Sequence, residues 1–141
     1  MSVDFSVHGK TDDMSVRFGN FEFFRFRYAL AQMVDSFAGT VYYRWVMSLS
    51  TYYNDGSGVS DMEKEYFKEH VPPVLYKFLF MSDCEGNLQW WECGRLYKEL
   101  RALMDKRDMD ILFKKKFLEK LDLFLDLLWF AKEQRRQMCW M

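Results

Sequence analysis

Residues 117–130, FLEKLDLFLDLLWF, are the most strongly patterned stretch of the chain. Apolar side chains recur there at the three- and four-residue spacing of a helix, on two different sides. One stripe consists of Phe117, Leu118, Leu121, Phe124, Leu125 and Leu128, and the other of Leu123, Leu127 and Phe130. We therefore predict a long C-terminal helix from about Met109 to Met138. Two apolar faces need two neighbours: the core of the domain covers one, and either another internal helix or a second protein chain covers the other.

The other end of the chain has the period-two pattern of half-buried strands. Apolar residues alternate with polar ones over residues 3–7 and again over residues 14–18, and residues 9–13 supply turn-forming side chains between them. A small N-terminal β-hairpin is predicted. A two-stranded ribbon is marginal alone, so it should pack on the helices.

Helical spacing dominates the middle of the chain. We expect a first helix over residues 21–37, capped by Gly19 and Asn20 and ended by Gly39. The alternation of apolar residues over residues 40–53 suits a strand and their length equally suits a buried helix, and of the two we favour the helix slightly.

Ser60 and Glu63 form a capping-box pattern that begins a short helix at Asp61. Further helices are expected over residues 73–80 and 89–106. The predicted fold class is mainly α (α+β): a small N-terminal β-hairpin packed on a multi-helix bundle with a long C-terminal helix, in a single domain spanning residues 1–141.

The composition of the chain argues against several classes of protein. The 141 residues carry 20 basic and 21 acidic side chains, so the global positive field typical of nucleic-acid-binding proteins is absent. Three cysteines without paired spacing argue against a disulfide framework. Residues 1–10 lack the pattern of a signal peptide, and no apolar run is long enough to span a membrane. A cytoplasmic protein is expected.

Aromatic residues make up 19% of the chain, more than a domain of this size readily encloses. They form either a bulky core or an interface, where Trp, Tyr, Phe and Met are enriched. The apolar tail, residues 138–141, also needs a surface on which to dock. We therefore predict that a partner protein is bound by four aromatic residues, Trp90, Trp91, Phe130 and Trp140.

The turn at residues 81–92 can be aligned with a twelve-residue calcium loop. Asp83, Glu85 and Glu92 then occupy positions three, five and twelve, with Gly86 at position six. Met81 stands at position one, however, where a carboxylate normally opens the site. We therefore favour a corner between helices, in which Gly86 adopts an unusual backbone angle and Asp83 and Glu85 cap the next helix. A divalent cation such as calcium is the minority interpretation, and no cofactor is otherwise expected.

Other candidate sites are weaker. Cys84, Cys93, His8 and His70 match no compact zinc pattern and no catalytic pairing. The basic runs at residues 114–116 and 135–136 are interleaved with acidic residues, which favours a solvated helix face over nucleic-acid contact.

The same turn carries a resemblance. Phe78-Leu79-Phe80, then Ser82-Asp83-Cys84-Glu85-Gly86, then Glu92-Cys93 resembles a group of small uncharacterised bacterial and phage proteins with a Ser-Asp-Cys-Asp/Glu-Gly turn between helices. That group has His where Met81 stands, which weakens the metal interpretation further. The match covers only residues 78–93 and implies a bacterial or phage setting.

Two functions follow as expectations. The first is a non-enzymatic interaction protein, a phage or mobile-element accessory factor that binds and inhibits a bacterial protein, with a homodimer through the C-terminal helix as a further option. The second is a small-molecule or divalent-metal binding module. It would use the turn from Asp83 to Glu92 and the aromatic residues Tyr42, Tyr43, Trp45, Trp90 and Trp91.

Overall fold

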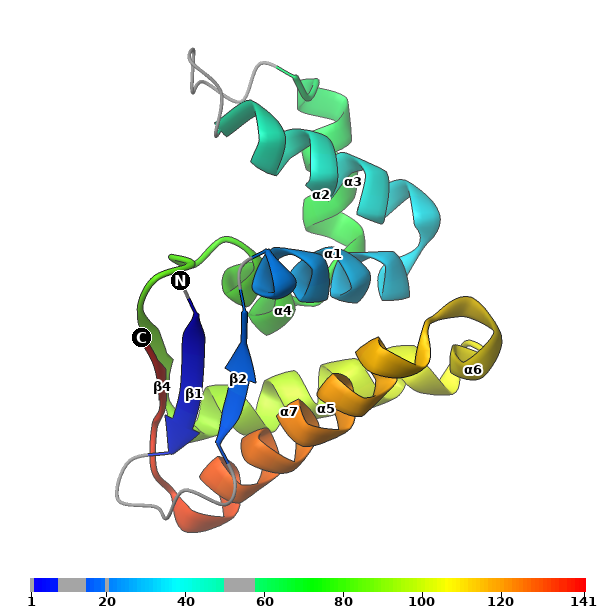
Figure 1. Ribbon diagram of the computed structural model, residues 1–141. Helices are drawn as coiled ribbons and strands as arrows, with labels where there is room; N and C mark the ends of the chain where they lie inside the picture. The colour runs from blue at the N-terminus through cyan, green and yellow to red at the C-terminus, as the bar shows by residue number, and fades with distance from the viewer. Residues whose placement is uncertain (1, 8–14, 20, 50–57) are drawn as a thin grey trace.

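The computed structural model describes residues 2–7, 15–19, 21–49 and 58–141. These residues form seven helices and four strands, which confirms the mainly α fold class with its N-terminal hairpin and long C-terminal helix (Figure 1). In chain order they are β1 Val3–Val7, β2 Val16–Phe18, α1 Glu22–Val34, α2 Ser36–Leu49, α3 Asp61–His70, α4 Pro73–Leu79, β3 Gly86–Leu88, α5 Trp90–Asp105, α6 Met109–Leu112, α7 Lys115–Gln134 and β4 Met138–Trp140.

The strands form one antiparallel sheet in the order β2-β1-β4-β3. The predicted hairpin is present, with Phe5 opposite Val16, while its predicted turn at residues 9–13 lies outside the described residues. The apolar tail is β4, and it pairs with β1 on one side and β3 on the other. Met138 and Trp140 therefore point into the core, so the surface on which the apolar tail docks is supplied by this chain itself.

The first long helix ends earlier than expected. It stops at Val34, and Gly39 lies inside α2 instead of ending α1. Asp35 breaks the helix because its carboxylate accepts a hydrogen bond from the Ala38 amide at 2.6 Å and so caps α2. Gly39 contributes to the junction of α1 and α2 in another way. A Cβ at this position would lie 2.5 Å from the Gln32 Cγ atom, so glycine permits the close approach of the two helices.

Most of the middle helices agree with the sequence pattern. Residues 40–49 are helical, as favoured, and residues 50–53 lie outside the described part. The capping box of Ser60 and Glu63 is formed at the start of α3, and α4 begins at Pro73. Helix α5 begins with a second capping box, between Gln89 and Glu92.

The C-terminal helix is shorter than predicted. Residues 109–112 form a separate turn of helix, Phe113 is extended, and α7 ends where Arg135 adopts a left-handed conformation with φ of 53°. On the second apolar stripe of α7, Leu127 is buried and Phe130 is half-buried, while Leu123 is 50% exposed. Helix α5 packs along α7, and Phe124 on the first stripe contacts Phe26 of α1 and Phe5 of β1.

One continuous core contains buried side chains from the sheet and from α1, α2, α3, α4, α5 and α7. Figure 1 shows α5 and α7 side by side beneath α1, with α2 and α3 projecting away on the other side of α1. Among the described residues, none of the helices combines the length and apolar character that a membrane span requires.

Candidate functional site: an aromatic groove beside helix α1

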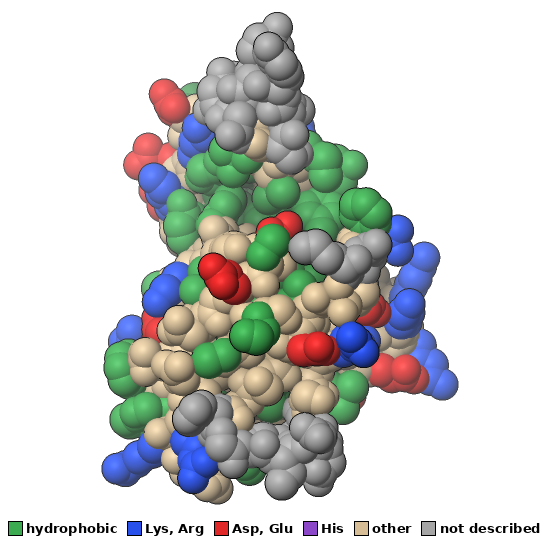
Figure 2. Space-filling view, turned by 60° about the vertical axis from the view of Figure 1, so that its left-hand side comes forward, with side chains coloured by type: hydrophobic (Ala, Val, Ile, Leu, Met, Phe, Trp, Pro, Cys, Tyr) green, Lys and Arg blue, Asp and Glu red, His purple; other side chains and the backbone are tan. Residues whose placement is uncertain are grey.

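A groove of about 600 Å³ opens where α1, α2, the segment after α4 and the end of the sheet meet. We call it the aromatic groove. Figure 2 shows it as a hollow lined with hydrophobic side chains. Its apolar lining comprises Val3, Phe21, Phe23, Phe24, Tyr42, Val46, Leu49, Leu79, Phe80, Met81 and Met141.

Phe21 lies at the edge of this groove in an unusual state. It is the residue before α1, it has a positive φ of 60°, and its side chain is 75% exposed. Adopting a left-handed backbone conformation costs a bulky L-amino acid roughly 1–2 kcal/mol. Neither backbone preference nor burial therefore explains a phenylalanine at this position.

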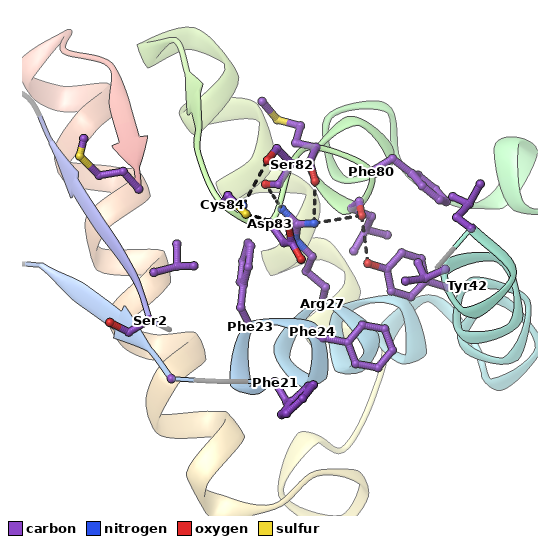
Figure 3. A pocket seen from close by; sticks show the side chains of 17 residues that line it. Ser2, Phe21, Phe23, Phe24, Arg27, Tyr42, Phe80, Ser82, Asp83 and Cys84 are labelled. Atoms are coloured by element: carbon purple, nitrogen blue, oxygen red, sulfur yellow. Dashed lines mark hydrogen bonds between the residues drawn. The ribbon is translucent and has the colours of Figure 1, made fainter. Parts of the chain in front are cut away.

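The polar floor of the groove is built around Arg27, whose side chain is only 5% exposed. Its guanidinium donates hydrogen bonds to the carbonyl oxygens of Met81 at 2.8 Å and Ser82 at 3.2 Å, just beyond the end of α4. Figure 3 shows Arg27 reaching from α1 toward Ser82, with Phe23 on one side and Tyr42 on the other. The guanidinium carbon lies 4.0 Å from the centre of the Phe23 ring, a cation–π geometry.

Burial lowers the pKa of Arg27, although Tyr42 and Asp83 partly offset that effect. The Tyr42 hydroxyl donates to the Leu79 carbonyl at 2.9 Å, and burial raises the pKa of Tyr42 to about 12. Arg27 and Tyr42 thus satisfy the carbonyl groups at the C-terminal end of α4 and hold α1, α2 and α4 in fixed positions around the groove.

Cys84 lies exposed at the rim, next to Asp83. Its thiol donates to the Asp83 carboxylate at 3.4 Å, and this hydrogen bond, with the nearby negative charge, raises the pKa of Cys84. A raised pKa keeps a thiol protonated and therefore weakly nucleophilic.

The calcium-loop alignment is not realised. Gly86 lies in β3, has no positive φ, and presents its α-carbon to the Trp140 indole, so the expected unusual backbone angle is absent. Glu92 forms an ion pair with Lys77 and accepts a hydrogen bond from the Gln89 amide at 3.0 Å. Within the described ranges, no three His, Cys, Asp or Glu side chains lie close enough together to hold a metal ion, so Asp83, Glu85 and Glu92 do not fit a divalent cation.

The four aromatic residues expected to bind a partner are placed differently from one another. Trp140 is 1% exposed and belongs to the core, which corrects its assignment to a surface. Trp91 is 53% exposed and packs edge-on against Trp90, over which Arg135 lies at 5.5 Å. Phe130 is half-buried. None of the four lines the aromatic groove.

The groove instead brings together Tyr42 and Asp83, which sequence reasoning had paired in the small-molecule alternative, while Tyr43, Trp45, Trp90 and Trp91 do not line it. The helical spacing over residues 21–37 predicted a helix but assigned no role to Phe24, which lies off the buried stripe of α1 and lines the groove. An aromatic residue off the buried stripe is the sequence signal that could have indicated a second apolar face.

Comparison of the chain with protein families, with curated proteins and with solved structures finds no match.

Proposed function

We propose that this chain is a non-enzymatic interaction protein whose aromatic groove receives an apolar segment of a partner protein. The observation that carries this proposal is Phe21, an aromatic side chain held in solvent at the groove edge in a disfavoured backbone conformation. If a partner buried the Phe21 side chain, the hydrophobic effect would stabilise the complex by about 25 cal/mol per Å² of apolar surface removed from water.

The surroundings of Phe21 support the same function. Leu49 from α2 and Met141 from the end of the chain are also exposed and line the groove, although they are far apart in sequence. Clustered apolar side chains that remain exposed in a folded domain are typical of protein-binding surfaces.

The groove is also preorganised. Because Arg27 and Tyr42 tie the segment after α4 to α1 and α2, the lining does not have to be assembled when a partner binds. Preorganisation lowers the entropic cost of association and so favours binding by this face.

We place the function in the cytoplasm, where the protein would bind a bacterial protein and inhibit it as a phage or mobile-element accessory factor. The setting rests on the resemblance of the turn at residues 78–93. A groove on a single chain that covers an apolar segment of its partner would inhibit by occupying a surface that the partner needs elsewhere.

Selection from a random peptide library on the immobilised protein tests the proposal. We expect enrichment of peptides with closely spaced apolar and aromatic residues. Phe21→Asp and Leu49→Asp should each weaken their binding at least about tenfold, as loss of an interface anchor does. Met62→Asp and Ile111→Asp are matched controls, because both side chains are highly exposed and lie outside the groove.

The outcomes separate the alternatives. Peptides that bind all four variants equally, or no enrichment at all, would contradict a groove that binds protein segments. Native mass spectrometry of the purified chain gives the second check: an added mass that disappears on denaturation would favour the small-molecule alternative, whereas a bare chain agrees with the proposal.

A further inference from the structure

A second hollow, of about 270 Å³, lies on another side of α1 and shares no residue with the aromatic groove. It opens between α1, β2 and the N-terminal part of α7, and we call it the cationic cleft. Its apolar floor consists of Phe18, Phe26, Ala29 and Phe117, and its rim of Arg25, Lys114, Lys116, Lys120 and Glu22.

The floor is suited to one flat ring. The centre of the Phe26 ring lies 4.7 Å from that of Phe18 and 5.6 Å from that of Phe117, so the three rings pack against one another as a continuous aromatic floor. Phe18 and Phe26 are buried, and the half-buried Ala29 and Phe117 are the parts of the floor that a ligand can reach. An apolar cavity of roughly 150 Å³ is known to bind benzene, so the cationic cleft has room for one aromatic side chain.

The rim carries four cations and one carboxylate. Glu22 lies 3.8 Å from the Lys116 ammonium and 3.9 Å from that of Lys120, and it also accepts a hydrogen bond from the Gly19 amide at 2.8 Å. The negative charge of Glu22 is therefore already shared between Lys116 and Lys120. Arg25 and Lys114 form no ion pair with any residue that the structure describes.

The backbone increases this positive potential. The first turn of α7 contains no acidic residue and its N-cap, Lys114, makes no side-chain capping bond. Cations at the positive end of a helix dipole are unfavourable in isolation and favourable beside a bound anion. An apolar floor with a cationic rim is thus complementary to a ligand with a ring flanked by negative charges.

We propose that the cationic cleft binds an acidic segment of a partner protein, with one aromatic side chain resting on Ala29 and Phe117 and flanking carboxylates paired with Arg25 and Lys114. This second contact site goes beyond the function proposed for the aromatic groove, and neither depends on the other. A nucleic acid fits less well, because exposed Asp110, Glu119 and Asp122 interrupt the basic residues along α6 and α7 and would repel a continuous phosphate backbone.

Fluorescence anisotropy with the full chain tests the proposal. The probe is a labelled synthetic peptide of one phenylalanine flanked on both sides by aspartates. We expect saturable binding that weakens about tenfold from low to high salt, because exposed ion pairs are screened. The same peptide with serine in place of phenylalanine should bind at least about tenfold more weakly, since the apolar floor would then stay empty.

Two variants with the same charge change provide the control. Arg25→Glu combined with Lys114→Glu should abolish peptide binding, whereas Lys68→Glu combined with Lys98→Glu, at exposed positions outside the cationic cleft, should leave affinity within about twofold. Ala29→Leu fills the floor without changing charge and should weaken binding of the phenylalanine peptide alone. Circular dichroism would verify that each variant is folded.

Several outcomes would overturn the proposal. These are no binding of the peptide, equal loss in both charge-reversed variants, equal affinity for the serine peptide, or full binding by Ala29→Leu. Displacement of the peptide by a single-stranded DNA of equal charge at equal or lower concentration would instead identify a nucleic-acid site.

Discussion

Replacing Trp140 by alanine should lower the free energy of unfolding by about 3–5 kcal/mol, the usual range for removing a fully buried large aromatic side chain. The indole is stacked on Phe5 with ring centres 4.9 Å apart and meets Phe78 edge-on at 5.6 Å. Its Nε1 atom donates to the Ser82 carbonyl at 3.1 Å. Each aromatic pair adds about 0.5–1.5 kcal/mol beyond area burial, so the upper half of the range is expected.

Urea unfolding followed by far-ultraviolet circular dichroism measures this change. A domain of this length is stable by roughly 5–15 kcal/mol, so the variant should lose about a quarter or more of its stability. The melting temperature should fall by about 10 °C or more, at roughly 2–4 °C per kcal/mol.

Trp91→Ala is the matched control, because Trp91 is 53% exposed and its ring contact is with Trp90. Exposed substitutions of this kind change stability by less than about 0.5 kcal/mol. If Trp140→Ala proved as mild as Trp91→Ala, the inference that β4 completes the sheet and that Trp140 belongs to the core would be refuted.

Three further perturbations test the structure. Gly86→Ala should destabilise by about 1–3 kcal/mol in thermal unfolding, because the new Cβ would lie 2.3 Å from the Trp140 ring; an unchanged midpoint would contradict the close approach. Ser60→Ala removes the side chain that caps α3 and should lower stability by about 1 kcal/mol in urea unfolding, with no change expected in the slope against urea. Burial raises the pKa of Cys93 and of Tyr42 to about 12, above their ordinary values of 9.0 and 10.0. Between those ordinary values and pH 12 the folded chain holds protons that the unfolded chain releases, so the free energy of unfolding should fall as the pH rises, by an amount on the order of 4 kcal/mol between pH 8 and pH 11. Urea unfolding at pH 8 to 11 should show this fall, and a combined Cys93→Ala and Tyr42→Phe variant should show less of it; an equal fall in that variant would assign the effect to other groups.

Local patterns in the sequence were sufficient for several elements. The helical spacing of Leu121, Phe124, Leu125 and Leu128 predicted the buried face of α7, and the Ser60-to-Glu63 spacing predicted the start of α3. These predictions succeed because helix periodicity and capping depend on residues within a turn or two of one another.

Other features depended on residues far apart in the chain. Nothing local to residues 138–141 indicates that they form the strand between β1 and β3, because that pairing is set by Phe5 and Gly86 against Trp140. The break between α1 and α2 depends partly on Arg107, whose guanidinium binds the last carbonyl groups of α1 at Met33 and Val34.

The candidate sites divide in the same way. The sequence by itself determined that this chain has more aromatic side chains than a small core readily encloses, and that its net charge is close to zero. Only the tertiary structure decided that Trp140 is buried while Phe21 is exposed, and that Arg25 and Lys114 meet around one apolar hollow. The physical reason is that exposure and charge clustering depend on which distant segments pack together, which the spacing of residues along the chain does not specify.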